Sequence, residues 1–65
     1  MALTVNGIPE PCPEGTIGDY LRRRGLEGQR MVVEHNRIVV PVERWDAVML
    51  ADGDQLEILS FVGGG

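Results

Sequence analysis

The sequence predicts a single α+β domain: a mixed five-stranded sheet with one helix packed across a face. Three observations predict it. Short runs of period-two alternation appear early and late in the chain, a stretch between them has helical spacing, and prolines mark two of the runs as edge strands. With 65 residues, 43% of them hydrophobic and 25% charged, the chain has the composition of a small globular domain with a thin core.

The first two strands, 2–5 and 8–12, form a predicted hairpin. Asn6-Gly7 joins them, and this pair is the strongest short hairpin signal because both residues tolerate the positive φ angles of a type I′ turn. The return strand contains Pro9 and Pro11, which cannot donate ladder hydrogen bonds. We therefore expect the second strand at an edge of the sheet.

A helix of about nine residues, too short to persist alone, is predicted to begin after Thr16. Thr16 has the character of an N-cap residue, and Asp19 can accept from the exposed amides of the first turn. The apolar residues that share one face at i, i+3, i+4 spacing are Ile17, Tyr20 and Leu21. Arg22-Arg23-Arg24 before Gly25 is interpreted as a solvated helix end rather than as a basic patch for an acidic partner.

Two more strands are predicted at 30–35 and 38–40. Alternation in the first places Met31, Val33 and His35 on the core face, and Pro41 stops the second, which marks it as another edge. Segment 41–50 is predicted to be irregular or a single helical turn, with Trp45 packed over the core. Asp52-Gly53-Asp54 is predicted to be a tight turn, in which Gly53 supplies the unusual backbone angle. A calcium loop is excluded, because its other ligands are missing.

The last strand, 55–61, runs directly into Val62-Gly63-Gly64-Gly65. Leu56 and Ile58 point inward, whereas Leu59 and Phe61 continue the outward side and turn it apolar. Two interpretations stay open: Leu59 and Phe61 form an exposed binding surface, or loop residues cover them. The glycines alone fit either a frayed end or a functional arm. We expect a folded domain over 1–61 and a flexible tail over 62–65.

The order of these elements is the β-grasp plan. In a sheet of spatial order 2-1-5-3-4 the first and last strands lie parallel in the middle, and strands two and four form the edges. Those two are the strands that the prolines mark. The proline positions therefore support the topology independently of the element order.

Composition excludes several classes of function. The formal net charge of -4 argues against a nucleic-acid-binding protein and fits a chain that binds a more basic protein surface. One cysteine and one histidine exclude a disulfide framework and a structural zinc site, so Cys12 and His35 are interpreted as structural residues. No signal peptide and no apolar run of roughly 20 residues is present, so we expect a cytoplasmic protein without a membrane partner.

The whole chain resembles the sulfur carrier proteins of thiamine biosynthesis, a ubiquitin-like family. The residues that carry the resemblance are Val5-Asn6-Gly7, Asn36, Ile38-Val39-Val40-Pro41, Glu43-Arg44-Trp45, Leu50-Ala51-Asp52-Gly53-Asp54, and Glu57-Ile58 leading into Phe61-Val62-Gly63-Gly64-Gly65. No single one of these motifs is specific, and the combination is what identifies the family. The family often has a basic residue after the proline, where this chain has Val42.

The resemblance implies a protein cosubstrate rather than an enzyme. An adenylating enzyme would use ATP to activate the carboxylate of Gly65, because an ionised carboxylate is a poor electrophile. A persulfide sulfur from a cysteine desulfurase or a persulfide-carrying protein would then replace AMP and leave a thiocarboxylate, which passes sulfur to thiazole synthase. Gly63 and Gly64 would let the tail enter narrow channels, and Leu59, Phe61 and Val62 would contact the partners. The resemblance implies no bound cofactor and no metal.

Three alternatives remain beside this interpretation. The small subunit of molybdopterin synthase uses the same tail chemistry for a different product. A protein modifier would form isopeptide bonds through Gly65. A β-grasp binding module without covalent chemistry would carry its glycines only as a frayed end.

Overall fold

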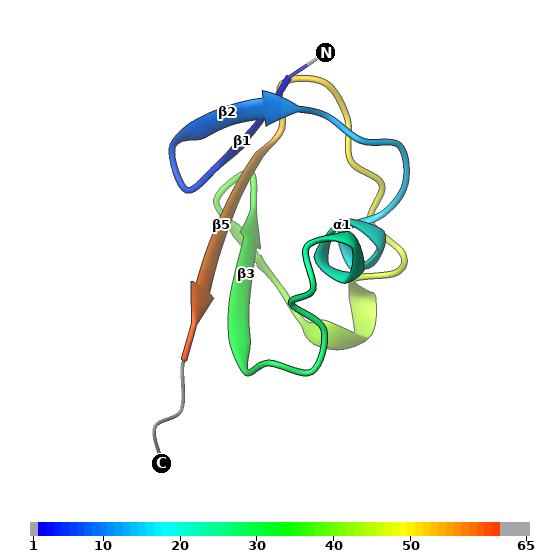
Figure 1. Cartoon of the computed structure of the whole chain (residues 1–65), viewed down its shortest axis with the longest axis vertical. Helices are drawn as coiled ribbons and strands as arrows, with labels where there is room; N and C mark the ends of the chain where they lie inside the picture. Colours follow the sequence, from blue (N-terminus) through cyan, green and yellow to red (C-terminus); the bar gives the residue numbers. More distant parts are fainter. Residues whose placement is uncertain (1, 62–65) are drawn as a thin grey trace.

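The computed structural model describes residues 2–61 and confirms the predicted sheet (Figure 1). Its strands are β1 (Ala2–Val5), β2 (Ile8–Pro11), β3 (Met31–His35), β4 (Ile38–Val40) and β5 (Gln55–Ser60). Their order across the sheet is β2-β1-β5-β3-β4. The two central strands, β1 and β5, pair in parallel, and the other neighbours pair antiparallel. The strands that prolines mark or end, β2 and β4, lie at the edges as predicted.

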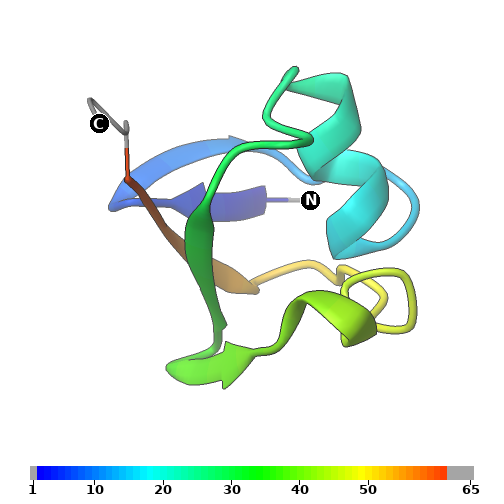
Figure 2. The same ribbon diagram turned by 90° about the horizontal axis from the view of Figure 1, so that it is seen from below.

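The helix α1 (Ile17–Arg23) and the 3₁₀ helix η1 (Val42–Arg44) lie on the same side of the sheet, which curves around them (Figure 2). The predicted capping box is present: Asp19 N donates to Thr16 Oγ1 at 3.1 Å, and Thr16 N donates to Asp19 Oδ2 at 3.0 Å. Hydrogen bonds from the Thr16 amide and the Arg22 guanidinium hold the pKa of Asp19 below its ordinary value.

Several predicted boundaries were wrong by one or two residues. The helix has seven residues rather than about nine, because Arg24 is its C-cap and Gly25 turns the chain away at φ 70°. Strand β2 ends at Pro11 rather than at Cys12. Strand β3 begins after Arg30, and β5 ends before Phe61. Element ends are the part of a fold that local pattern determines least.

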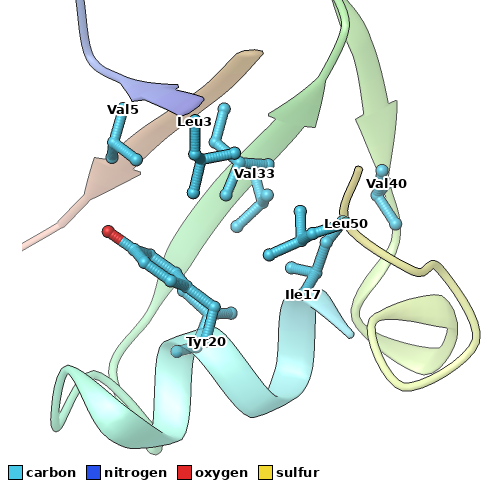
Figure 3. Packing of buried hydrophobic residues seen from close by; sticks show 9 residues of the cluster. Leu3, Val5, Ile17, Tyr20, Val33, Val40 and Leu50 are labelled. Carbon is cyan, nitrogen blue, oxygen red and sulfur yellow. The ribbon is translucent and has the colours of Figure 1, made fainter. Parts of the chain in front are cut away.

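Nine buried side chains form the core between the sheet and α1 (Figure 3). They are Leu3, Val5, Ile17, Tyr20, Leu21, Val33, Val40, Leu50 and Leu56. Cys12 and Trp45 are half-buried against this cluster, as predicted. His35 is also half-buried, and its Nε2 lies 2.7 Å from Asp54 Oδ2, which joins the end of β3 to the loop before β5.

The loop around η1 completes the amino-terminal end of the helix. Ile17 N donates to Val48 O and Gly18 N donates to Trp45 O, both at 3.0 Å. These two amides belong to the first helical turn, which has no partners of its own within the helix. Trp45 Nε1 in turn donates to Val40 O at 2.8 Å. The segment that the sequence predicted as irregular or single-turn therefore holds α1 against β4.

The arginine triplet is not simply a solvated helix end. Arg22 Nη2 lies 2.9 Å from Asp19 Oδ1 and 2.8 Å from Asp46 Oδ1, so it joins the helix to the loop after η1. The hydrogen bonds that Arg22 donates to Asp46 and Asp19 raise the pKa of Arg22 above its ordinary value. Arg24 Nη1 lies 3.2 Å from Glu10 Oε1 on β2. Two of the three arginines thus link α1 to other elements.

Candidate functional site: the end of the last strand

The predicted site lies at the carboxyl end of β5, and the structure describes part of it. Leu59 and Phe61 lie within the described residues, whereas Val62, Gly63, Gly64 and Gly65 lie outside them. The question that the sequence left open about Leu59 and Phe61 has an answer. Their exposed fractions are 60% and 58%, so no loop covers them. Two exposed large apolar side chains therefore lie at the end of the strand, Leu59 within β5 and Phe61 just after it.

Leu59 belongs to an apolar patch on the face of the sheet turned away from α1. In the register of the sheet Leu59 is opposite Val32 of β3. Val39 of β4 pairs with Glu34, which is two residues from Val32 and on the same face. Val39 is 58% exposed and Val32 is half-buried. We call Val32, Val39 and Leu59 the outer-face patch.

Two carboxylates lie beside the outer-face patch. Glu34 of β3 and Glu57 of β5 are directly opposite each other in the register, on the same face as Leu59. Like charges directly opposite on a sheet are unfavourable, so this placement does not serve the stability of the isolated domain. An apolar patch with acidic neighbours is complementary to an apolar surface that carries basic residues.

Phe61 lies elsewhere than strict alternation predicts. Because β5 ends at Ser60, Phe61 no longer follows the alternation of the strand, and it lines a hollow of about 860 Å³ on the side of the sheet that α1 covers. The lining includes Leu21 of the helix, Met31 at the start of β3 and Trp45. Phe61 N donates to Arg30 O at 2.9 Å, which continues the pairing with β3 past the end of the strand. Apolar side chains thus flank the strand end on both sides.

The neighbours of Leu59 and Phe61 in the folded chain were not predicted from the sequence. The sequence predicted Val32 and Val39 as strand residues but not as part of a binding surface, although each precedes a core residue, Val33 or Val40, and so lies on the opposite face of its strand. Met31 and Trp45 were taken for core residues, and both also line the hollow beside Phe61. The outward-facing apolar residues of β3 and β4 were a signal that could have found the patch, whereas nothing local predicts the hollow.

The titratable pairs lie away from the strand end and have structural partners. Burial raises the pKa of Tyr20 to about 12, and its hydrogen bond to Glu10 at 2.8 Å adds to the effect. Burial would raise the pKa of Asp54, but hydrogen bonds from His35, the Ala51 amide and Asn36 outweigh it and hold that pKa below its ordinary value. The Tyr20–Glu10 pair joins α1 to β2, and the hydrogen bonds of Asp54 join the loop before β5 to the end of β3.

No cluster of three or more His, Cys, Asp and Glu side chains within residues 2–61 could hold a metal ion. None of the helices in this described part of the chain combines the length and apolar character that a membrane crossing requires.

Comparisons with known proteins agree with this geometry. The model of the ThiS family matches residues 3–65, which includes the terminal glycines. The "Sulfur carrier protein ThiS" of Bacillus subtilis is 45% identical over 51 residues, covering 78% of this chain and 77% of that protein. The crystal structure of a thiamine biosynthesis protein (ThiS) from Geobacter metallireducens superposes with a TM-score of 0.82 at 35% identity, and the match covers 100% of both chains.

A third relative is much longer. A protein named "Thiazole synthase" from Paramagnetospirillum magneticum is 35% identical over 66 residues, which cover 100% of this chain but only 20% of that protein. That longer chain thus contains one segment similar to the whole of this chain.

Proposed function

Because the chain belongs to the ThiS family, we propose that it is the sulfur carrier protein of thiamine biosynthesis, a cytoplasmic cosubstrate that an ATP-using adenylating enzyme charges at the carboxylate of Gly65. The observation that carries the proposal is the family match, which runs through Gly63, Gly64 and Gly65 to the last residue. The described residues support it with two exposed apolar side chains, Leu59 in β5 and Phe61 just after the strand, a few positions before those glycines in the sequence.

The proposed chemistry takes place on the carboxylate of Gly65. The carboxylate attacks the α-phosphorus of ATP, which forms an acyl-adenylate and releases pyrophosphate. A persulfide sulfur, supplied by a cysteine desulfurase or a persulfide-carrying protein, then attacks the acyl carbon and displaces AMP. A thiol cleaves the resulting S–S bond, so a thiocarboxylate remains on Gly65. This chain supplies the reacting group, and the partners supply the catalysis.

We propose thiazole synthase as the acceptor of the sulfur. The support is the relative of that name, in which a segment similar to this whole chain makes up a fifth of the protein. Two activities in one reaction sequence are often carried by one chain in some organisms and by separate chains in others. On this proposal the separate chain binds its thiazole synthase through a non-covalent surface around the strand end.

Intact mass spectrometry tests the proposed function. The chain is incubated with ATP, its adenylating enzyme, cysteine and a cysteine desulfurase. The expected product has one oxygen replaced by sulfur, and the change reverses when thiazole synthase and its other substrates are added. Deletion of Gly65 is the control and should abolish the change. A sulfur-containing product that still forms without Gly65 would place the chemistry at another residue. If the carrier instead gives its sulfur to a pterin-synthesising partner, the assignment to thiamine biosynthesis would be wrong.

The partner-binding roles of Leu59, Phe61 and Val62 remain a proposal, and Phe61→Asp tests the residue that links the strand end to the hollow. We expect the adenylating enzyme's KM for this variant to rise about tenfold, because an exposed apolar contact is replaced by a charge that must be desolvated. Thermal unfolding should be almost unchanged, since Phe61 is 58% exposed.

Ile8→Asp is the matched control for Phe61→Asp. Ile8 is also a large exposed residue, 66% accessible, but it lies on the edge strand β2. The same substitution there should leave the KM as it is in the parent chain. Equal effects of the two variants would mean that added negative charge alone weakens binding, and an unfolded Phe61→Asp protein would mean that Phe61 belongs to the core.

A further inference from the structure

The side chain of Asn6 binds the backbone of the last strand from 52 positions away along the chain. Ile58 N donates to Asn6 Oδ1 at 2.7 Å, and Asn6 Nδ2 donates to Ile58 O at 3.1 Å. Both hydrogen bonds of the Ile58 peptide groups on this side of β5 therefore go to one side-chain amide. Ile58 is three residues before Phe61, so the contact lies close to the candidate site.

The Asn6 side chain takes the place of a strand that has turned away. The backbone ladder of β1 with β5 continues as far as the bonds from Thr4 N to Asp54 O and from Asn6 N to Leu56 O. The chain then turns at Asn6 and Gly7, which have φ angles of 51° and 83°. A straight strand would next offer Ile58 one carbonyl acceptor and one amide donor. A carboxamide offers the same two groups, and a carboxylate does not.

Because of this contact, β5 is hydrogen-bonded on both of its edges as far as Ile58, two residues before the strand ends. On the other side β5 pairs with β3 as far as Met31 and Ser60, and Phe61 N bonds to Arg30 O. Without the Asn6 contact, β5 would be held on one side only from Glu57 onward. A strand held on one side can twist and fray away from its neighbour, and the direction of whatever follows it changes with that motion.

We propose that Asn6 is a positioning residue for the sulfur-transfer reaction. By fixing Ile58 from the β1 side, it sets the direction in which β5 presents Leu59 and Phe61 to the adenylating enzyme. This inference rests on the proposed function. Asn6 acts through the strand and not on the reacting atoms, so its loss should weaken productive binding and leave the chemical step as it is.

The chain contains a matched control at the opposite end of the same strand. Asn36 also has a φ of 51° at a hairpin turn. Its Oδ1 accepts from Gln55 N at 2.9 Å, and its Nδ2 donates to Asp54 Oδ1 at 3.2 Å. Asn36 thus accepts a hydrogen bond from the first residue of β5, Gln55, much as Asn6 accepts one from Ile58 near the end of the strand. Glycine tolerates the positive φ at both positions, so Asn→Gly removes each side-chain contact and keeps each turn.

The experiment compares Asn6→Gly and Asn36→Gly in the full chain by amide hydrogen exchange and by steady-state adenylation kinetics. In Asn6→Gly we expect the Ile58 amide to exchange about tenfold faster, because it loses its acceptor. We expect the KM for the carrier to rise about fivefold with kcat within about twofold of the parent value, because the strand end must be ordered on binding. In Asn36→Gly only the Gln55 region should exchange faster, with KM unchanged.

Each other outcome overturns the proposal or a specific part of it. An unchanged KM in Asn6→Gly, or an equal rise in Asn36→Gly, would show that Asn6 contributes only to stability. If Asn6→Gly does not fold, Asn6→Asp is used in its place. The aspartate still accepts from Ile58 N, but its second oxygen is an acceptor that faces the acceptor Ile58 O, so that contact is lost. The same rise in KM is expected. If the unaltered chain is not adenylated, the proposed function fails and this inference fails with it, whereas normal charging with unchanged variant kinetics refutes this inference alone.

Discussion

Gly18 lies in the first turn of α1, where the absence of a side chain leaves room for an ion pair. A Cβ at this position would meet Asp46 Oδ1, the atom that pairs with Arg22 Nη2 at 2.8 Å. Alanine in a helix is usually more stable than glycine by about 0.5–1 kcal/mol. Here the gain is offset, because the Asp46 carboxylate must move away from Arg22.

We therefore expect Gly18→Ala to change the free energy of unfolding by much less than this usual gain, since the ion pair of Arg22 with Asp46 is lost. In an Asp46→Ala background the same substitution should stabilise the domain by about 0.5–1 kcal/mol, because nothing is left to displace. Urea unfolding of the four proteins of this double-mutant cycle measures both values. Identical effects in the two backgrounds would contradict the steric explanation.

The helix as an element depends on its cap and on the loop that completes it. Seven residues are too few for an isolated helix in water, so α1 exists because Ile17, Tyr20 and Leu21 are buried and because its first amides have partners. Thr16 supplies one of those partners from its side chain, and Val48 and Trp45 supply two from the backbone.

We expect Thr16→Ala to lower the free energy of unfolding by about 1 kcal/mol, because the amide of Asp19 loses its acceptor and the capping box opens. Thr16→Ser keeps the hydroxyl and should remain within about 0.5 kcal/mol of the parent chain. Chemical denaturation followed by circular dichroism distinguishes the two. A Thr16→Ser protein as unstable as Thr16→Ala would show that the methyl group of Thr16, and not its oxygen, matters.

The sequence determines most elements of this fold, because their signals are local. Asn6-Gly7, Thr16 with Asp19, and the proline-marked edges each act within a few residues, and all three predictions are confirmed. What the sequence could not predict depends on contacts between distant positions. The bonds of Asn6 to Ile58 and of Arg22 to Asp46 appear only once the sheet order and the path of the η1 loop are known. The prediction that Phe61 points outward was wrong, because the alternation of side chains stops where β5 ends, at Ser60.

At the scale of the whole molecule, stability should decrease in acid. The pKa of Asp54 lies below its ordinary value, so this carboxylate stabilises the folded state above the unfolded-state pKa of about 3.9 and loses that contribution as the pH falls through its folded pKa. The pKa of Asp19 is lowered as well and has the same sign. Both groups act in the same pH range.

We expect Asp54→Asn to be less stable than the parent chain near pH 6, with the difference narrowing as the pH falls through the folded-state pKa of Asp54, because the parent carboxylate then becomes protonated and loses its advantage. Urea unfolding at a series of pH values measures this difference. Glu43→Gln, an exposed carboxylate of η1, is the control and should follow the parent curve throughout. Parallel curves for Asp54→Asn and the parent would refute the role of Asp54.

The central place of β5 also has a consequence for how the protein is made. The strand that pairs with both β1 and β3 is formed by residues 55–60, which are synthesised after all the other described strands. Until then β1 lacks its parallel neighbour and the core lacks Leu56. A prematurely ended chain that stops before this strand therefore cannot fold, and cellular proteases that degrade unfolded chains would remove it. Folding thus acts as a check on length, so that molecules surviving to meet their partners have been translated at least through the strand that leads into the glycines.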